Sequence, residues 1–137
     1  MSSIIHISEM VSIALHSMVV IANANKELLN VKKIAQTTGA SESHLSKVLQ
    51  RLVKANFIRS VRGPKGGFTL SKPPNKITFL DIYEVMEGSL TTTQCPTNCE
   101  ACSFESCIFG GVPEKLNQEF IEYLRNKKLS DFIASLG

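Results

Sequence analysis

The sequence predicts a mainly α-helical fold with a small β-hairpin wing: a winged helix-turn-helix followed by a C-terminal dimerisation helix. Two short amphipathic segments joined by Thr38-Gly39-Ala40 form a helix-turn-helix signature. Two short β-prone runs then flank the basic, glycine-rich stretch 62–66, as expected for a hairpin. With 137 residues, 43% of them apolar, the chain can bury a modest core, and we expect one compact domain.

The first three predicted elements are helices with recognisable ends. Ser8 can cap a helix over 9–23 that is apolar on most of its surface, as in a central helix or one shared between subunits. A short helix over 31–38 ends at the glycine of the turn, which can adopt the left-handed conformation that follows many helices. Ser41 can cap the next helix, over 42–54, which carries its leucines and a valine on one face.

The predicted hairpin comes next and is followed by a fourth helix. Its strands are the β-prone runs 57–61 and 67–71. Pro73-Pro74 then interrupts regular secondary structure, because proline cannot donate a backbone hydrogen bond. Thr78 opens a helix that runs to about Glu87 and ends at a glycine.

The C-terminal part is predicted to contain a long amphipathic helix beyond Pro113. Its apolar stripe comprises Leu116, Phe120, Ile121, Tyr123 and Leu124. The stripe suits pairing with a second copy of the helix or packing against its own domain. Ser130 is predicted to cap a final short helix. We therefore divide the chain into a winged module (1–88), a cysteine-rich loop (89–111) and a dimerisation helix with a C-terminal helix (112–137).

Charge is distributed unevenly along the chain. Residues 42–76 contain eight basic residues and one acidic residue, so this segment carries +7 and the remainder −4. Such segregation is typical of a phosphate-binding face, the alternative being a solvated surface with uneven charge. The apolar run 13–22 is too short to span a membrane and contains His16 and Ser17. Because no secretory signal is visible, we expect a cytoplasmic protein that does not contact membranes.

The second helix of a helix-turn-helix lies in the DNA major groove, where its N-terminal residues reach base edges. The candidates for base contacts, all expected to be exposed, are Ser43, His44, Ser46 and Lys47, beside Glu42. Arg51 lies further along and is expected to touch phosphate, as is Lys54 unless it is simply solvated. Arg62 and Lys65 at the hairpin tip could enter the adjacent minor groove. His44 could instead face solvent or cap the helix.

All four cysteines of the chain lie within thirteen residues, as Cys95-x3-Cys99-x2-Cys102-x4-Cys107. Thiolates this close together favour joint ligation of a soft metal centre. The reducing cytosol favours ligation or redox chemistry over structural disulfides. Three alternatives remain open: an iron–sulfur cluster of the 4Fe–4S or 2Fe–2S type, structural zinc, or a metal-free thiol–disulfide switch.

The runs SHLSKVLQRL (43–52) and SVRGPKGGFTL (60–70) resemble the Rrf-type winged-helix repressors, and the similarity extends over about 7–124. The resemblance implies a homodimer that binds a palindromic operator in double-stranded DNA. It also implies an iron–sulfur cluster held between the winged module and a long dimerisation helix. By position, it assigns base reading to Ser43, Ser46 and Lys47 and minor-groove contact to Arg62. Ser46 replaces an acidic residue that discriminates between bases in some relatives, so operator preference need not be shared.

The cysteine spacing departs from the family pattern of three cysteines. Cys95 and Cys107 match the outer pair, but Ala101 stands at the middle position with Cys99 and Cys102 on either side. Some relatives complete the site with a ligand from the first helix of the partner subunit. The matching positions here are Ser12 and His16, of which His16 has a suitable nitrogen. The alternative is that His16 is merely packed and hydrogen-bonded.

These observations predict a DNA-binding repressor whose operator affinity is controlled by an iron–sulfur cluster that senses redox, iron–sulfur or nitric-oxide status. A zinc-stabilised or thiol–disulfide-switched repressor is the alternative within DNA binding. From another class, the alternative is a dithiol oxidoreductase that uses the winged fold as a scaffold. We expect no enzyme, since no Ser/His/Asp set, paired carboxylates or phosphate loop stands out.

Overall fold

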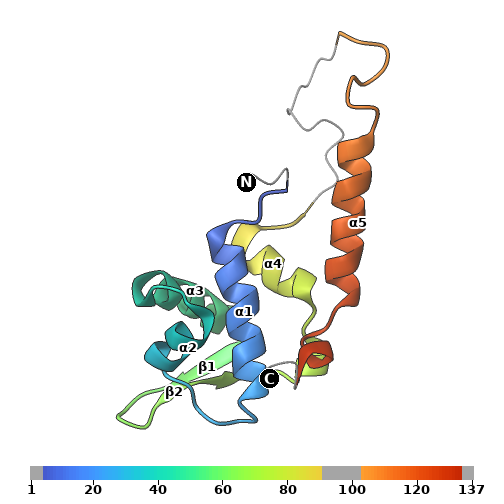
Figure 1. Cartoon of the computed structure of the whole chain (residues 1–137). Coiled ribbons are helices and arrows are strands. Elements are labelled where there is room, and N and C mark those ends of the chain that lie inside the picture. Colours follow the sequence, from blue (N-terminus) through green and yellow to red (C-terminus); the bar gives the residue numbers. More distant parts are fainter. Residues whose placement is uncertain (1–4, 91–102, 134–137) are drawn as a thin grey trace.

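The computed structural model describes residues 5–90 and 103–133, and the described part is mainly helical with one two-stranded hairpin (Figure 1). The elements in chain order are α1 (Glu9–Asn23), α2 (Val31–Thr38), α3 (Glu42–Lys54), β1 (Ile58–Val61), β2 (Gly67–Leu70), the 3₁₀ turn η1 (Pro74–Lys76), α4 (Phe79–Glu87), α5 (Val112–Asn126) and the 3₁₀ turn η2 (Leu129–Phe132). This arrangement confirms the predicted winged helix-turn-helix.

The helix ends follow from local side-chain chemistry. The Ser8 hydroxyl accepts the Val11 N–H at 3.2 Å, and the Ser41 hydroxyl accepts the His44 N–H at 3.3 Å, so both predicted caps are confirmed. Thr78 and Asp81 form a reciprocal capping box at the start of α4. These bonds satisfy N–H groups that have no partner within the helix.

Helix α1 is central, as its all-round apolar surface predicts. It packs against α2, α3, α4, β2 and η2, and its Val11, Ala14 and Met18 side chains have no solvent exposure. Helix α3 contributes Leu45, Val48, Leu49 and Leu52, which are also completely buried. The core therefore lies directly behind the helix-turn-helix and holds the orientation of α3.

The wing is anchored to the rest of the fold by backbone pairing. Strands β1 and β2 are antiparallel, with Ile58 opposite Leu70. Leu29, in the segment between α1 and α2, exchanges two backbone hydrogen bonds with Phe68, at 3.1 and 2.8 Å. A side chain at Gly67 would place its Cβ 2.6 Å from the Leu29 carbonyl oxygen, so only glycine fits this approach. The root of the wing is thus fixed to the segment that joins α1 to α2.

The structure corrects two details of the C-terminal prediction. Helix α5 begins at Val112, so that Pro113 lies in its first turn, where proline needs no hydrogen-bond partner. Ser130 does not cap a helix: it lies inside the turn η2. The reason is tertiary, because an antiparallel bridge between Thr78 and Lys128 keeps the chain extended up to the start of that turn.

Helix α5 divides its apolar stripe between two environments. Ile121 and Leu124 are buried where α5 packs against α4, whereas Leu116 and Tyr123 are 45% and 48% exposed. In Figure 1 the first half of α5 extends beyond the winged module. Among the described residues, no helix is long and apolar enough to cross a membrane.

Candidate nucleic-acid interface and cysteine segment

The polar side chains in the first turns of α3 differ in their solvent exposure and in their hydrogen bonds within the protein. Ser43 and Lys47 are exposed. Ser46 is half-buried rather than exposed, because its hydroxyl donates to the Glu42 carbonyl oxygen at 2.8 Å. This bond commits the Ser46 proton and leaves the hydroxyl oxygen able to accept a hydrogen bond.

His44 is oriented by a residue of another helix. Its Nδ1 lies 3.2 Å from Oε1 of Glu9 in α1, and the two side chains are 55% and 71% exposed. The exposed pair restrains the imidazole ring at the surface that the second helix of this motif turns toward DNA. Its contribution to stability is small because solvent screens it.

Arg51 contacts the end of α4. Its Nη1 donates to the Met86 carbonyl oxygen at 3.3 Å. A guanidinium group has five N–H donors, so this bond leaves others for a second partner. The structure therefore connects the recognition helix to the last turn before the cysteine-rich loop.

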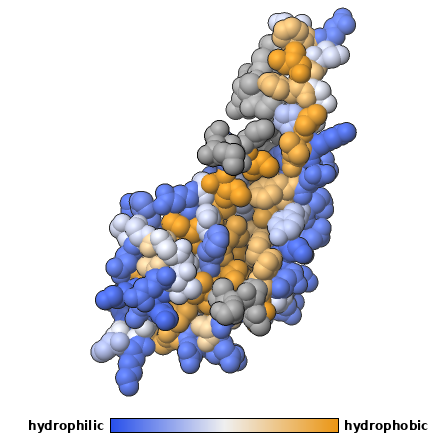
Figure 2. Space-filling view, in the orientation of Figure 1, coloured by the Kyte–Doolittle hydropathy of each residue, from blue (hydrophilic) through white to orange (hydrophobic). Residues whose placement is uncertain are grey.

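The hairpin tip presents two cations on a tight turn. The Gly66 N–H donates to the Gly63 carbonyl oxygen at 3.0 Å, and the Arg62 and Lys65 side chains are exposed. All eight basic residues of the segment 42–76 are exposed. They are Lys47, Arg51, Lys54, Arg59, Arg62, Lys65, Lys72 and Lys76. Figure 2 shows a largely hydrophilic surface over the part formed by α2, α3 and the wing, and a hydrophobic band that continues along α5.

Cys107 is the one predicted ligand cysteine within the described residues, since Cys95, Cys99 and Cys102 lie outside them. Its thiol is free and exposed. Its carbonyl oxygen accepts the Gly110 N–H at 3.0 Å, in a turn that leads directly into α5. Phe104 and Ile108, nearby in the chain, are 64% and 73% exposed, so the segment before α5 also presents apolar side chains to solvent.

His16, the predicted partner-subunit ligand, is exposed on α1. Its Nδ1 lies 2.6 Å from the Ser12 carbonyl oxygen, which can only accept, so Nδ1 carries the proton. The lone pair is then on Nε2, the arrangement found in many metal-ligating histidines. Within 5–90 and 103–133, no three His, Cys, Asp or Glu side chains gather as a metal site.

Three long-range contacts join α1, α3 and α4 at one end of the winged module, and sequence reasoning missed all of them. The Ser8 hydroxyl donates to the Glu87 carboxylate, Glu9 pairs with His44, and Arg51 binds the Met86 carbonyl. Tyr83 and Glu87 both lie in α4. Burial raises the pKa of Tyr83, and the nearby Glu87 carboxylate raises it further. The partners lie at least 35 residues apart in the chain, so no local pattern could have revealed them.

A helix-turn-helix with an exposed, polar second helix and a basic wing defines the chain as a winged-helix DNA-binding protein. The Rrf2 family model, described as an iron-dependent transcriptional regulator, matches residues 7–135. The chain belongs to the Rrf2 family, and the expected resemblance is confirmed. It is a DNA-binding transcription regulator and not an enzyme, which removes the dithiol oxidoreductase alternative.

Individual relatives agree with this assignment. A protein of Aquifex aeolicus (strain VF5), described as an HTH-type transcriptional regulator, is 30% identical over 129 residues, covering 92% of this chain and 90% of its own. The structure of CymR, the global cysteine regulator of B. subtilis, has a TM-score of 0.79 at 26% identity and covers 98% of this chain and 100% of that one. The structure of T. potens IscR has a TM-score of 0.76 at 28% identity, with coverage of 97% and 89%.

Proposed function

We propose that this regulator is a homodimeric repressor whose affinity for a palindromic operator is controlled by an iron–sulfur cluster. Cys95, Cys99, Cys102 and Cys107 are the proposed ligands, and the cluster would report redox, iron–sulfur or nitric-oxide status in the cytoplasm. The observation that carries the proposal is the free, exposed Cys107 thiol at the entrance to α5, in a four-cysteine segment of a family described as iron-dependent.

The residues present fit such a cluster chemically. Four thiolates are soft donors of the kind that hold iron–sulfur centres, and Cys107 is not consumed by a disulfide. When bound, the cluster supplies a redox- and nitric-oxide-reactive group. His16 of the partner subunit is a further proposed ligand through Nε2.

DNA reading is assigned to α3 and the wing. We expect Ser43 and Lys47 to contact base edges and Arg62 with Lys65 to contact the minor groove. The Ser46 oxygen is suited to accept from an adenine or cytosine amino group, because its own proton is already donated. His44 would contact DNA in the orientation that Glu9 imposes, and Arg51 would contact phosphate with the donors that Met86 leaves available.

The proposed coupling between loop and operator passes through the end of α4. The cysteine-rich loop starts two residues after Glu87, and Arg51 binds the carbonyl of the preceding residue, Met86. A change in the loop that moves the end of α4 would therefore change the position of α3. If the two positions of α3 differ in DNA affinity, the state of the cluster shifts the bound population by that difference.

A metal-free thiol–disulfide switch is the second candidate. A structural zinc ion bound by the cysteines is the third. The switch is favoured by the exposed Cys107 thiol and by the similarity in fold to CymR of Staphylococcus aureus, which has a solved structure described as an oxidized form. A disulfide with a neighbouring cysteine would change the loop without any metal.

One sample can discriminate between these candidates. The protein is purified without oxygen, its absorption spectrum is recorded, and its iron, sulfide and zinc are assayed. Visible absorption with matching iron and sulfide supports the cluster. A colourless protein containing zinc would contradict it in favour of structural zinc. A colourless, metal-free protein after anaerobic reconstitution would leave the thiol switch.

A further inference from the structure

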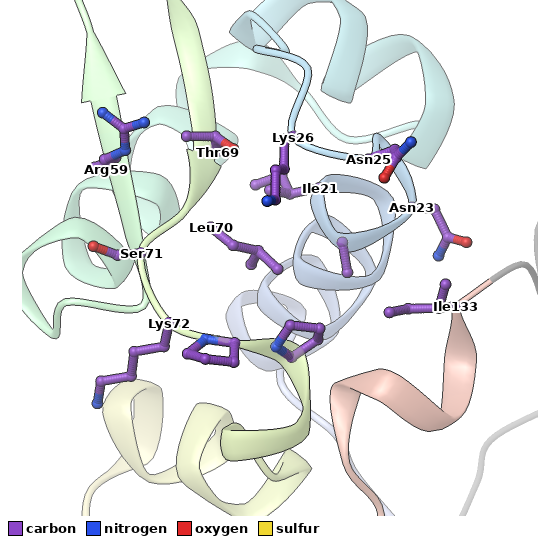
Figure 3. A pocket seen from close by; sticks show the side chains of 13 residues that line it. Ile21, Asn23, Asn25, Lys26, Arg59, Thr69, Leu70, Ser71, Lys72 and Ile133 are labelled. Atoms are coloured by element: carbon purple, nitrogen blue, oxygen red, sulfur yellow. The ribbon is translucent and has the colours of Figure 1, made fainter.

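A hollow of about 700 Å³ lies at the root of the wing (Figure 3). One wall is the hairpin and the segment after it, including Arg59 and Leu70, and the other is the end of α1 with the turn that follows, including Lys26. Its volume is in the range of sites that bind small organic molecules. The hollow contains no proposed base-reading residue or cluster ligand, although Arg59 and Lys72 also belong to the predicted phosphate-binding cations.

The lining combines an apolar floor with positive charge. Ile21, Leu70 and Ile133 supply apolar surface, and Figure 3 shows Lys26 above the middle of the hollow, with Arg59 at the wing side and Ile133 opposite. No carboxylate belongs to the lining among the described residues. A second lysine, Lys72, contributes mainly its aliphatic stem, because its Nζ lies over the Phe57 ring, 4.9 Å from the centroid. Within the described part of the chain, no ion pair involves Lys26 or Arg59, and two such cations above apolar surface suit a ligand with an anionic head and an apolar body.

The backbone that carries Lys26 is held in an unusual conformation. Asn25 and Lys26 both have left-handed backbone angles, with φ of 52° and 71°. Such a conformation is uncommon for lysine and costs energy, so it persists only where the surroundings impose it. Residues in conformations of this kind cluster at ligand clamps. The Lys26 side chain lies over the middle of the hollow (Figure 3).

We propose that the hollow between Lys26 and Arg59 binds a small organic carboxylate with an apolar tail. Arg59 would pair with the carboxylate in a forked hydrogen bond, Lys26 would add a second charge, and the tail would lie on Leu70 and Ile133. The ligand would touch both the hairpin and the α1–α2 turn, which are joined by the Leu29–Phe68 backbone pair. It would therefore restrain the wing relative to the helix-turn-helix, giving the regulator an effector site independent of its cysteines.

The test is a titration of the full-length, isotope-labelled protein followed by amide resonances in two-dimensional NMR. Hexanoate is the probe, acetate supplies the charge alone, and hexanol supplies the tail alone. We expect saturable shifts at Leu70 and Lys26, and hexanoate should bind at least about tenfold more tightly than either fragment. Equal binding of acetate and hexanoate, shifts confined to other surfaces, or no saturable shift would overturn the proposal.

Two variants make the test specific. Arg59→Gln and Lys26→Gln should each weaken hexanoate binding about tenfold, whereas Lys115→Gln, on the exposed face of α5, should leave it unchanged. The same proteins are compared for operator binding at several salt concentrations. If the two variants reduce operator affinity and its salt dependence while hexanoate binding is absent, these cations contact DNA phosphates and the effector site is refuted. Because the NMR titration requires neither DNA nor a cluster, its outcome is separate from that of the proposed cluster.

Discussion

Some side chains of the proposed DNA interface already form hydrogen bonds within the protein, whereas others present their charge to solvent. Arg62 and Lys47 present exposed cations, whereas His44, Ser46 and Arg51 each bond to a group of the same chain. A side chain held in place loses less conformational entropy on binding but has fewer groups left to offer. Exposed cations of the wing should therefore depend most on DNA for their partners.

Replacing Arg62 with alanine tests the role of the wing. If the side chain enters the minor groove, operator binding should weaken by about 1–3 kcal/mol at fixed salt concentration, measured by fluorescence anisotropy of a labelled operator. Arg62 is exposed at the hairpin tip, so the fold should not be affected. Lys115→Ala, an exposed cation on α5, is the control and should bind normally. Unchanged operator binding by the Arg62 variant would show that this side chain does not contact DNA and that the wing has a structural role.

At the scale of elements, α3 is positioned both by the core and by its contact with α4. Its four wholly buried aliphatic side chains fix the helix against α1, and the Arg51 bond to Met86 connects it to the turn before the cysteine-rich loop. A hydrogen bond with a charged donor commonly contributes about 1.5–3 kcal/mol when shielded and less when exposed. Arg51 is exposed, so a contribution below this range is expected.

The variant Arg51→Met keeps an apolar stem and removes the donors of this contact. We expect the free energy of unfolding to fall by about 1 kcal/mol, measured by urea denaturation of the apo protein. If the contact transmits the state of the loop, the variant should also reduce the ratio of operator affinities between the two states of the cysteines. Lys54→Met, one turn further along α3, is the matched control. Equal ratios in Arg51→Met and the native protein would eliminate this route.

At the scale of the whole molecule, helix α5 is covered only in part by the described part of the chain, since two of its 15 residues are buried. Ile121 and Leu124 attach it to α4, but Leu116, Tyr123 and Val112 remain exposed along a helix that extends beyond the winged module (Figure 1). Exposed apolar side chains in a row are typical of a surface that pairs with a partner. Pairing of two copies would place two recognition helices on successive half-sites of a palindrome, as in other helix-turn-helix dimers.

Leu116→Glu tests this pairing. If α5 forms the interface of the proposed homodimer, a charge at this position should yield a monomer in sedimentation velocity and weaken binding to the full operator. Because the side chain is 45% exposed, the monomer should keep its circular dichroism spectrum. Gln118→Glu adds the same charge at another exposed position of α5 and should stay dimeric. A dimeric Leu116→Glu protein would exclude this part of α5 from the interface.

The sequence by itself determined the elements whose signals are local. The caps at Ser8, Ser41 and Thr78 and the apolar face of α3 depend on residues within about four positions of one another, and the structure confirms each of them. The basic hairpin was equally readable, because glycine and proline mark turns directly. Residues 43–52 and 60–70 were enough to indicate the family.

Only the tertiary structure decided how these parts work together. It placed Glu9 beside His44 and Arg51 beside Met86, moved the last turn so that Ser130 caps nothing, and enclosed the hollow between Lys26 and Arg59. The physical reason is that each of these features joins segments far apart in the chain. Such contacts are set by the packing of the core and by backbone pairing, and no short-range periodicity or capping pattern records them.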